Sequence, residues 1–188
     1  MNHYNPRCSK CNTHACSCKV VCSLQSVSIG PFRATVPGGS AVVPAATCGL
    51  CDYGYIYNLS AEVVAIEADV IFDTTGITTV GITHTPGTAQ IVVTNPGDYE
   101  VTFSVSGVEP NQFALFINGA PVAGTVYGSG AGTQQNTGQA IIAIAAGDVL
   151  TLRNHSSAAA VTLQTLAGGT QINVNASVSI KMLNFNTT

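Results

Sequence analysis

From residue 53 onward the sequence consists of short apolar runs separated by turn residues. In the stretch "DYEVTFSVSG", Tyr99, Val101, Phe103 and Val105 alternate with polar residues. Strict alternation places the apolar side chains on one face of a strand and the polar side chains on the other. No segment repeats its apolar residues at helical spacing over a useful length, so the pattern predicts an all-β fold.

Tight-turn signals divide this region into strands. Asn118-Gly119 in "QFALFINGAPV" favours a two-residue hairpin turn, and Gly147-Asp148 separates two strands in "QAIIAIAAGDVLTLRNHS". "YGYIYNLS" alternates aromatic with small residues, while "ADVIFD", "AQIVV", "AVTLQTL" and "QINVNASVSIKML" are the further expected strands. About eight to ten strands in a region of this length predict a β-sandwich of the jelly-roll type.

The amino-terminal part has a different texture. We expect a Cys-rich connector arm over residues 1–47, which contains prolines and glycines, and a head domain over residues 48–188. Pro31, Pro37 and Pro44 exclude a helix and favour extended backbone, and a flexible linker would be richer in Ser and Gly. Three apolar residues of the arm, Val27, Ile29 and Phe32, have no local apolar partner. We expect the arm to dock elsewhere through them and through the adjacent Arg33.

Charged residues make up only 8% of the chain, against about a quarter in ordinary soluble domains. A surface so poor in charge suits a subunit that is largely covered by copies of itself. Residues 1–47 carry four basic residues and no acidic one, while residues 48–188 carry two basic and nine acidic residues. Four cations without interleaved aromatics are a weak nucleic-acid footprint, so we expect the arm to meet an acidic head and no nucleic acid.

Export and membrane signals are missing from the pattern. Residues 1–19 contain no apolar run of the kind that a signal peptide needs. No stretch approaches the roughly 18 apolar residues of a membrane span, so no membrane partner is expected. The expectation is a protein that stays in the compartment that makes it, or that becomes exposed when the producing cell lyses.

Seven cysteines leave at least one thiol without a partner in the same chain. Two Cys-x-x-Cys pairs, with His3 and His14 as substitutes, leave a structural zinc site open as one reading. Reduced, idle thiols are another. Disulfides between subunits explain the odd count together with the connector arm, so we predict cross-linking cysteines and no metal or cofactor. The residues concerned are Cys8, Cys11, Cys16, Cys18, Cys22, Cys48 and Cys51.

Catalytic motifs are not found. His84 and His155 lie near turn signals, and nothing in the sequence ties either to a carboxylate or a nucleophile. The sequence has no phosphate-binding loop, nucleophile elbow or zinc-protease motif. Glu67, Asp69 and Asp73 lack the ligand spacing of a calcium loop. We therefore predict that the chain is not an enzyme, although a metal-dependent role of the Cys-rich arm stays open as a hypothesis.

The ordered set "GDYEVTFSVSG", "FALFINGAPV", "GQAIIAIAAGDVLTLRN" and "ASVSIKML" resembles the globular head shared by complement-type and tumour-necrosis-factor (TNF) proteins. It is also similar to the carboxy-terminal heads of collagen-like glycoproteins on Bacillus spore surfaces, over about residues 53–185. This resemblance implies an all-β, TNF-like jelly roll that forms homotrimers and has no active site. Candidate trimer-interface residues are Tyr55, Tyr57, Phe113 and Phe116.

The chain departs from those glycoproteins because it has no Gly-X-Y collagen stalk. A head with a short Cys-rich arm looks like a subunit of spore-appendage fibres. The resemblance thus implies a structural subunit made in the mother-cell cytosol and placed at the spore surface or exosporium. Its trimers would stack head to tail through inserted arms locked by inter-subunit disulfides, with an exosporium anchor protein and a collagen-like tip protein as candidate partners. The alternative is a trimeric adhesin whose head recognises a glycan or a protein.

Overall fold

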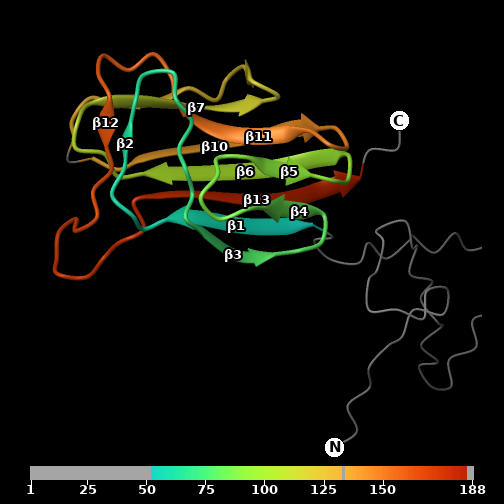
Figure 1. Ribbon diagram of the computed structural model, residues 1–188. Helices are drawn as coiled ribbons and strands as arrows, with labels where there is room; N and C mark the ends of the chain where they lie inside the picture. Colours follow the sequence, from blue (N-terminus) through green and yellow to red (C-terminus); the bar gives the residue numbers. More distant parts are fainter. Residues whose placement is uncertain (1–51, 133, 186–188) are drawn as a thin grey trace, which may run out of the picture. The chain divides into compact units, whose positions relative to one another are not determined.

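The computed structural model describes residues 52–132 and 134–185. These residues form thirteen strands and contain no helix, which confirms the all-β prediction (Figure 1). In chain order the strands are β1 (Tyr53–Asn58), β2 (Val63–Val64), β3 (Thr74–Thr78), β4 (Ile82–His84), β5 (Ile91–Val93), β6 (Gly97–Val105), β7 (Asn111–Ile117), β8 (Ala120–Pro121), β9 (Tyr127–Ser129), β10 (Asn136–Ile144), β11 (Val149–Asn154), β12 (Val161–Thr162) and β13 (Ala176–Phe185).

Two larger sheets form the sandwich. One has the strand order β10-β6-β13-β1-β3, and the other has the order β4-β5-β11-β7-β8, with β9 also paired to β7. A small third sheet pairs β12 with β2. All of these pairings are antiparallel. The arrangement is the jelly-roll sandwich that the turn spacing predicts.

Alternation of side chains decides which face of each strand enters the core. In β6, Tyr99, Val101, Phe103 and Val105 are buried and the residues between them are partly exposed, as the sequence predicts. The central strand β13 does the same with Val178, Ile180 and Met182, which are buried. Long strands with one apolar face thus bury that face against the opposite sheet.

Turn chemistry is also as predicted at the β7–β8 hairpin. Asn118 and Gly119 have φ values of 51° and 80°, the left-handed conformation that both central residues of a type I′ turn require. At Gly147, φ is 87° in the turn between β10 and β11. Those two strands do not pair with each other: β10 pairs with β6, and β11 pairs with β5 and β7. The Gly147-Asp148 turn therefore carries the chain from one sheet to the other.

Some expected strands are shorter than the apolar runs suggest. "ADVIFD" makes two isolated bridges, Asp69 with Arg153 and Phe72 with Thr88, instead of a strand. Its backbone lies beside the second half of β11, in line with β5, because the Val70 N–H donates to the Leu152 carbonyl at 2.8 Å. The final strand begins at Ala176, later than the run "QINVNASVSIKML" predicts.

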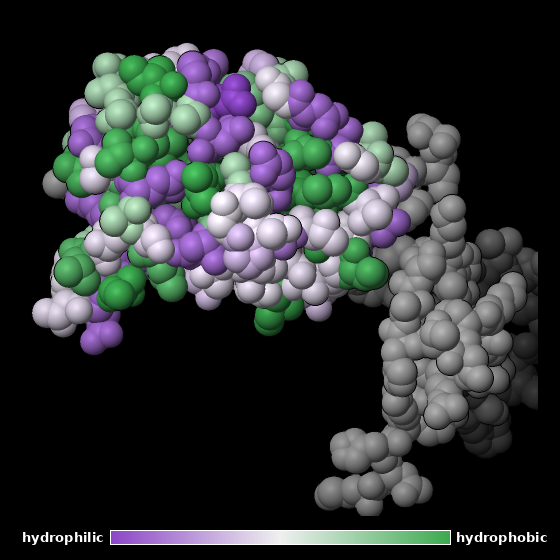
Figure 2. Space-filling view, in the orientation of Figure 1, coloured by the Kyte–Doolittle hydropathy of each residue, from purple (hydrophilic) through white to green (hydrophobic). Residues whose placement is uncertain are grey.

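The two ends of the sandwich differ. Tyr53 pairs with Lys181 at one end of the five-stranded sheet, and Asn58 pairs with Ala176 at the other. The described chain therefore begins and finishes at the same end, here called the terminus end. The opposite end, called the loop end, carries β2, β12 and the loop of residues 163–175, which protrudes at the lower left (Figure 1). Figure 2 shows hydrophobic residues (green) on this protruding part.

The compact unit formed by the head begins at Asp52. The predicted boundary between residues 47 and 48, the seven cysteines, and the predicted docking residues Val27, Ile29, Phe32 and Arg33 lie outside the described residues. Within the described ranges there is no helix long and apolar enough to cross a membrane.

Candidate functional site

The outward face of the five-stranded sheet carries a stripe of tyrosines. Tyr53, Tyr55 and Tyr57 alternate in β1 with Gly54 and Ile56, and it is Gly54 and Ile56 that point into the core. Tyr53 and Tyr55 are 41% and 39% exposed. The rings of Tyr55 and Tyr57 are stacked, with 5.2 Å between their centroids and 28° between their planes. Stacked rings give the face a rigid apolar ridge.

Cross-strand register extends this ridge into three rows across the sheet. The rows consist of Tyr53, Lys181, Glu100 and Ile141; of Tyr55, Ser179, Thr102 and Gln139; and of Tyr57, Ser177, Ser104 and Thr137. Small hydroxyl residues occupy the middle of the second and third rows, so the surface beside the tyrosines is low and uncharged. We call this set the aromatic face.

Ionic groups on the aromatic face are already paired at one point. The Lys181 Nζ lies 3.3 Å from the Glu100 Oε1, across adjacent strands. The Gln135 amide donates to the Ser104 hydroxyl at 2.6 Å. A surface with stacked aromatic rings beside small, uncharged residues and few unpaired charges is suited to contact with another protein surface.

Two of the four predicted interface residues lie on this face, and two lie elsewhere. Tyr55 and Tyr57 belong to it. Phe113 is fully buried inside the sandwich, and Phe116 is buried on the outward side of the six-stranded sheet. The Arg153 guanidinium lies 4.2 Å from the Phe116 ring centroid and covers it. Because their own subunit covers both phenylalanines, neither leaves surface for a neighbour.

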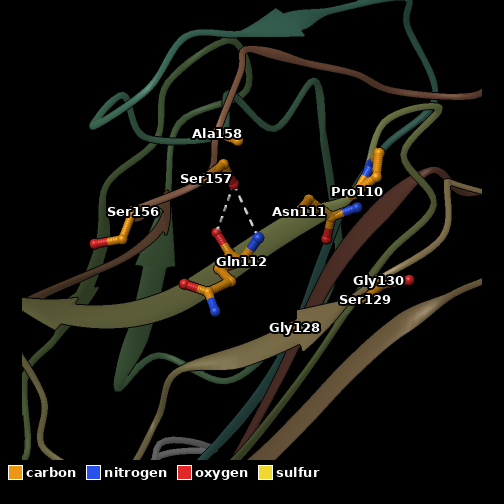
Figure 3. Close-up of a pocket in the computed structure, with 9 residues that line it drawn as sticks. All are labelled: Pro110, Asn111, Gln112, Gly128, Ser129, Gly130, Ser156, Ser157 and Ala158. Atoms are coloured by element: carbon orange, nitrogen blue, oxygen red, sulfur yellow. Dashed lines mark hydrogen bonds between the residues drawn. The ribbon is translucent and has the colours of Figure 1, made fainter.

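A shallow depression lies between β7, β9 and the turn after β11 (Figure 3). Its volume is about 480 Å³, and it is lined by Pro110, Asn111, Gln112, Gly128, Ser129, Gly130, Ser156, Ser157 and Ala158. The Ser157 hydroxyl is held by the backbone of Gln112, whose N–H donates to it at 2.9 Å. The depression is open and its exposed lining mixes polar with apolar surface, so it does not enclose a ligand.

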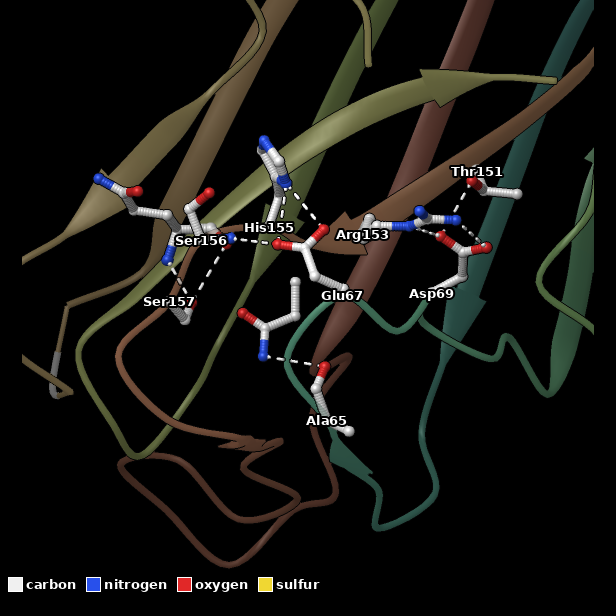
Figure 4. Close-up of polar contacts among 10 residues, drawn as sticks. Ala65, Glu67, Asp69, Thr151, Arg153, His155, Ser156 and Ser157 are labelled. Atoms are coloured by element: carbon white, nitrogen blue, oxygen red, sulfur yellow. Dashed lines mark hydrogen bonds and ion pairs between the residues drawn. The ribbon is translucent and has the colours of Figure 1, made fainter. Parts of the chain in front are cut away.

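Beside the depression lies a network that sequence reasoning missed (Figure 4). The His155 Nδ1 lies 2.9 Å from a carboxylate oxygen of Glu67, and the Ser156 N–H donates to the other oxygen at 2.9 Å. The hydrogen bond from His155 holds the pKa of the Glu67 carboxyl below its usual range. Asp69 makes a two-pronged contact with Arg153, at 2.7 Å and 3.1 Å.

The network fastens the segment of residues 65–72 to β11. Glu67 and His155 are 88 positions apart in the chain, so no local signal connects them. Ser156 bonds Glu67 through its backbone N–H, and the Ser157 hydroxyl bonds the Gln112 backbone. The groups therefore have structural partners and do not form a nucleophile–base pair.

Possible metal ligands are dispersed over the described head. Among residues 52–132 and 134–185, no group of three or more His, Cys, Asp or Glu side chains could hold a metal ion. The three acids considered for calcium have separate partners. Glu67 meets His155, Asp69 meets Arg153, and Asp73 accepts from the Ser60 hydroxyl at 2.6 Å.

Comparison with solved structures places the head in the TNF- and complement-type class of jelly rolls. The globular domain of zebrafish complement 1qA protein matches with a TM-score of 0.56 and 12% identity, covering 72% of this chain and 99% of that one. The Eiger TNF of S. frugiperda matches with a TM-score of 0.50 and 13% identity, covering 72% and 94%. At these identities the likeness establishes the fold.

The family model described as the BclA C-terminal domain matches residues 54–177, and the chain belongs to this family. The comparison with curated proteins found no match. The predicted resemblance to exosporium-type heads with a TNF-like jelly roll is thus confirmed. A head of this family is a binding or structural domain and not an enzyme.

Proposed function

We propose that the chain is a structural subunit of a spore-surface fibre or layer, in which heads associate as trimers through the aromatic face. The observation that carries this proposal is the combination of Tyr53, Tyr55 and Tyr57 with a low, nearly uncharged surface beside them. Tyrosine is enriched at protein interfaces, and burial of these rings would remove apolar area from water at little cost in side-chain entropy. The membership in a spore-surface family supports the location.

Polymerisation is the second part of the proposal. A trimer with two unlike ends can stack head to tail, and such a heterologous contact gives a filament because it does not close. Each trimer brings three arms, so once one arm has docked the others dock at high effective concentration. Disulfides between the arm cysteines of adjacent subunits would then lock the contact. An exosporium anchor protein and a collagen-like tip protein are the further proposed partners at the two ends of the fibre.

The trimer is tested by a matched pair of substitutions. Thr102 lies in the middle row of the aromatic face, and Thr83 lies exposed on the outward side of the six-stranded sheet. We expect Thr102→Arg to convert trimers into monomers, because it places an unpaired cation at the centre of the contact. Thr83→Arg should leave the trimer intact. Size-exclusion chromatography with light scattering measures the mass, and a monomeric wild-type chain at micromolar concentration would overturn the proposal.

A binding head that recognises a glycan or a protein is the second candidate function. The observation in its favour is the open depression, where Gln112 and Ser157 come together from different elements (Figure 3). A glycan array probed with the full chain, and with Gln112→Ala as the matched variant, tests it. Binding of one glycan class that Gln112→Ala abolishes, with the trimer unchanged, would support this function; absence of binding to any class would remove it.

A further inference from the structure

The loop end of the head exposes four large apolar side chains. Val63, Val108, Leu166 and Ile172 are each between 49% and 66% exposed. They belong to β2, to the turn after β6 and to the loop of residues 163–175. Large apolar residues gathered at one end of a small domain are a common sign of an interaction surface.

Two of these side chains lie in one row. Val63 pairs with Thr162 across the small sheet, and the Val108 N–H donates to the Thr162 carbonyl at 2.9 Å. Thr162 therefore lies between the two valines, and all three point away from the buried pair of Val64 and Val161. Side chains on one face of a small sheet lie close enough to form one contact strip.

The other two are held outward by a pinned loop. The Asn173 N–H donates to the Thr165 carbonyl at 3.1 Å, and its carboxamide oxygen accepts from the Ala167 N–H at 2.7 Å. These bonds hold the two sides of the loop together, with Leu166 on one side and Ile172 on the other. Figures 1 and 2 show the loop protruding with hydrophobic residues at its surface. The exposure of Leu166 and Ile172 is therefore fixed by specific hydrogen bonds.

Charge adds a second property to the loop end. Glu109 accepts from the Thr162 N–H at 2.7 Å, and this bond lowers the pKa of its carboxyl, so Glu109 is ionised at neutral pH. Asp73 accepts from the Ser60 N–H at the same end. In the described part of the chain, the two Lys and Arg residues, Arg153 and Lys181, pair with other acids. The loop end thus combines apolar side chains with carboxylates that lack a Lys or Arg partner.

The arm has the complementary chemistry in its sequence. Residues 1–47 carry four basic residues and no acidic one, and residues 23–36 contain Val27, Ile29 and Phe32 next to Arg33. The arm is joined to the head at the terminus end, because Asp52 lies there. The 18 residues between Arg33 and Asp52 can span up to about 60 Å when extended. If heads stack with the terminus end of one against the loop end of the next, the point where the arm joins one head lies beside the loop end of its neighbour.

We propose that the loop end is the docking surface for residues 23–36 of a second copy of this chain. The row of Val63, Thr162 and Val108 and the loop that carries Leu166 and Ile172 bind the apolar arm residues, and Glu109 and Asp73 attract Arg33. This inference rests on the proposed head-to-tail assembly and assigns the surface that receives the arm.

The test uses the full chain with Val108→Lys and Ile172→Lys together, and with Val126→Lys as the matched control. Val126 is as exposed as Val108 but lies outside the loop end, before β9. We expect the double variant to keep the trimer mass and the melting temperature and to form no fibres by negative-stain electron microscopy. Val126→Lys should form fibres like those of the wild-type chain.

Mixtures of the double variant with the wild-type chain test whether the loop end binds the arm of a second copy. The double variant keeps its arm, so it can add to a wild-type fibre but offers no docking surface to the next trimer. We expect mean fibre length to fall roughly in inverse proportion to the variant's mole fraction. Unchanged fibre length in mixtures would mean that the arm docks on its own head or elsewhere, and wild-type-like fibres from the double variant would refute the docking surface. A wild-type chain that forms no fibres at all would instead refute the proposed assembly.

Discussion

At the scale of single residues, the Glu67–His155 contact involves two residues with an uncommon backbone conformation, Glu67 and Ser156. Glu67 and Ser156 have φ values of 61° and 60°, a left-handed region that residues other than glycine seldom adopt. Both residues belong to one contact, since the Ser156 N–H and the His155 ring meet the Glu67 carboxylate. Tertiary hydrogen bonds thus hold two residues in conformations that their local sequence does not favour.

We expect Glu67→Gln to reduce stability in a pH-dependent way. The hydrogen bond from His155 lowers the pKa of the Glu67 carboxyl in the folded state. The carboxylate's contribution is therefore present at pH values above the ordinary glutamate range and is lost as the pH falls through the lowered pKa. Urea unfolding at a series of pH values should show a wild-type advantage near about pH 5.5 that shrinks toward about pH 3. An advantage that stays constant or grows on acidification would contradict this account.

Gly138 lies where the packing leaves no room for a Cβ atom. A Cβ at Gly138 would clash with the Phe103 ring and lie 2.6 Å from the Tyr127 ring, and these two rings are themselves in edge-to-face contact. Gly138→Ala should therefore lower the free energy of unfolding by about 1–3 kcal/mol, the usual cost of overpacking. Gly130→Ala is the matched control, because a Cβ there meets no atom within 4 Å. Equal denaturant midpoints for the two variants would refute the expected clash.

At the scale of elements, one side-chain contact joins the β7–β8 hairpin to the turn between β10 and β11. The Asn118 amide donates to the Asp148 carboxylate at 2.7 Å, and its oxygen accepts from the Val149 N–H at 2.9 Å. Asp148 also accepts from the Ala145 N–H at 2.8 Å. The two turns at the terminus end are thus fastened together.

Replacing Asp148 should loosen both turns without unfolding the sandwich. Asp148→Ala removes two hydrogen bonds at an exposed site, so we expect a loss of about 1 kcal/mol in the free energy of unfolding. Hydrogen exchange should accelerate at the amides of Ala145 and Val149 and stay unchanged in the central strand β13. Asp148→Asn keeps one of the two acceptor oxygens that Asn118 and Ala145 use, so it should give an intermediate effect. Uniform acceleration across β13 would show that the contact supports the whole head.

At the scale of the whole molecule, we expect the docked arms to hold the trimers together and the disulfides between subunits to make the fibre durable. A disulfide between subunits removes dissociation as a route of failure, whereas a docked arm is reversible. The two contributions are therefore separable by removing the cysteines that precede the docking segment.

We expect replacement of Cys8, Cys11, Cys16, Cys18 and Cys22 by Ser to leave fibre assembly possible. The fibres should fall apart in hot detergent, where wild-type fibres persist, and wild-type fibres treated with reductant should behave like the variant. Electron microscopy and gel electrophoresis after heating measure this. If variant and reduced fibres are as robust as the wild type, docking alone provides the strength and the cysteines serve another attachment, such as the anchor at the spore surface.

Local sequence patterns were enough to predict the all-β fold and which face of its strands is buried. Alternation in β6 predicts its buried face, and Asn118-Gly119 predicts the hairpin, because both depend on neighbouring residues in the chain. The alternation of aromatic with small residues in "YGYIYNLS" likewise places Tyr55 and Tyr57 on one face of β1. These parts of the candidate site follow from local periodicity.

Which faces and ends of the head stay exposed depends on how its strands pack. Phe113 and Phe116 are as aromatic as the tyrosines, yet the opposite sheet and Arg153 cover them. The Glu67–His155 pair joins residues from segments far apart in the chain, and the β10–β11 turn crosses between sheets instead of closing a hairpin. The physical reason is that burial and pairing depend on the packing of elements distant in sequence, whereas alternation and turn chemistry depend on adjacent residues.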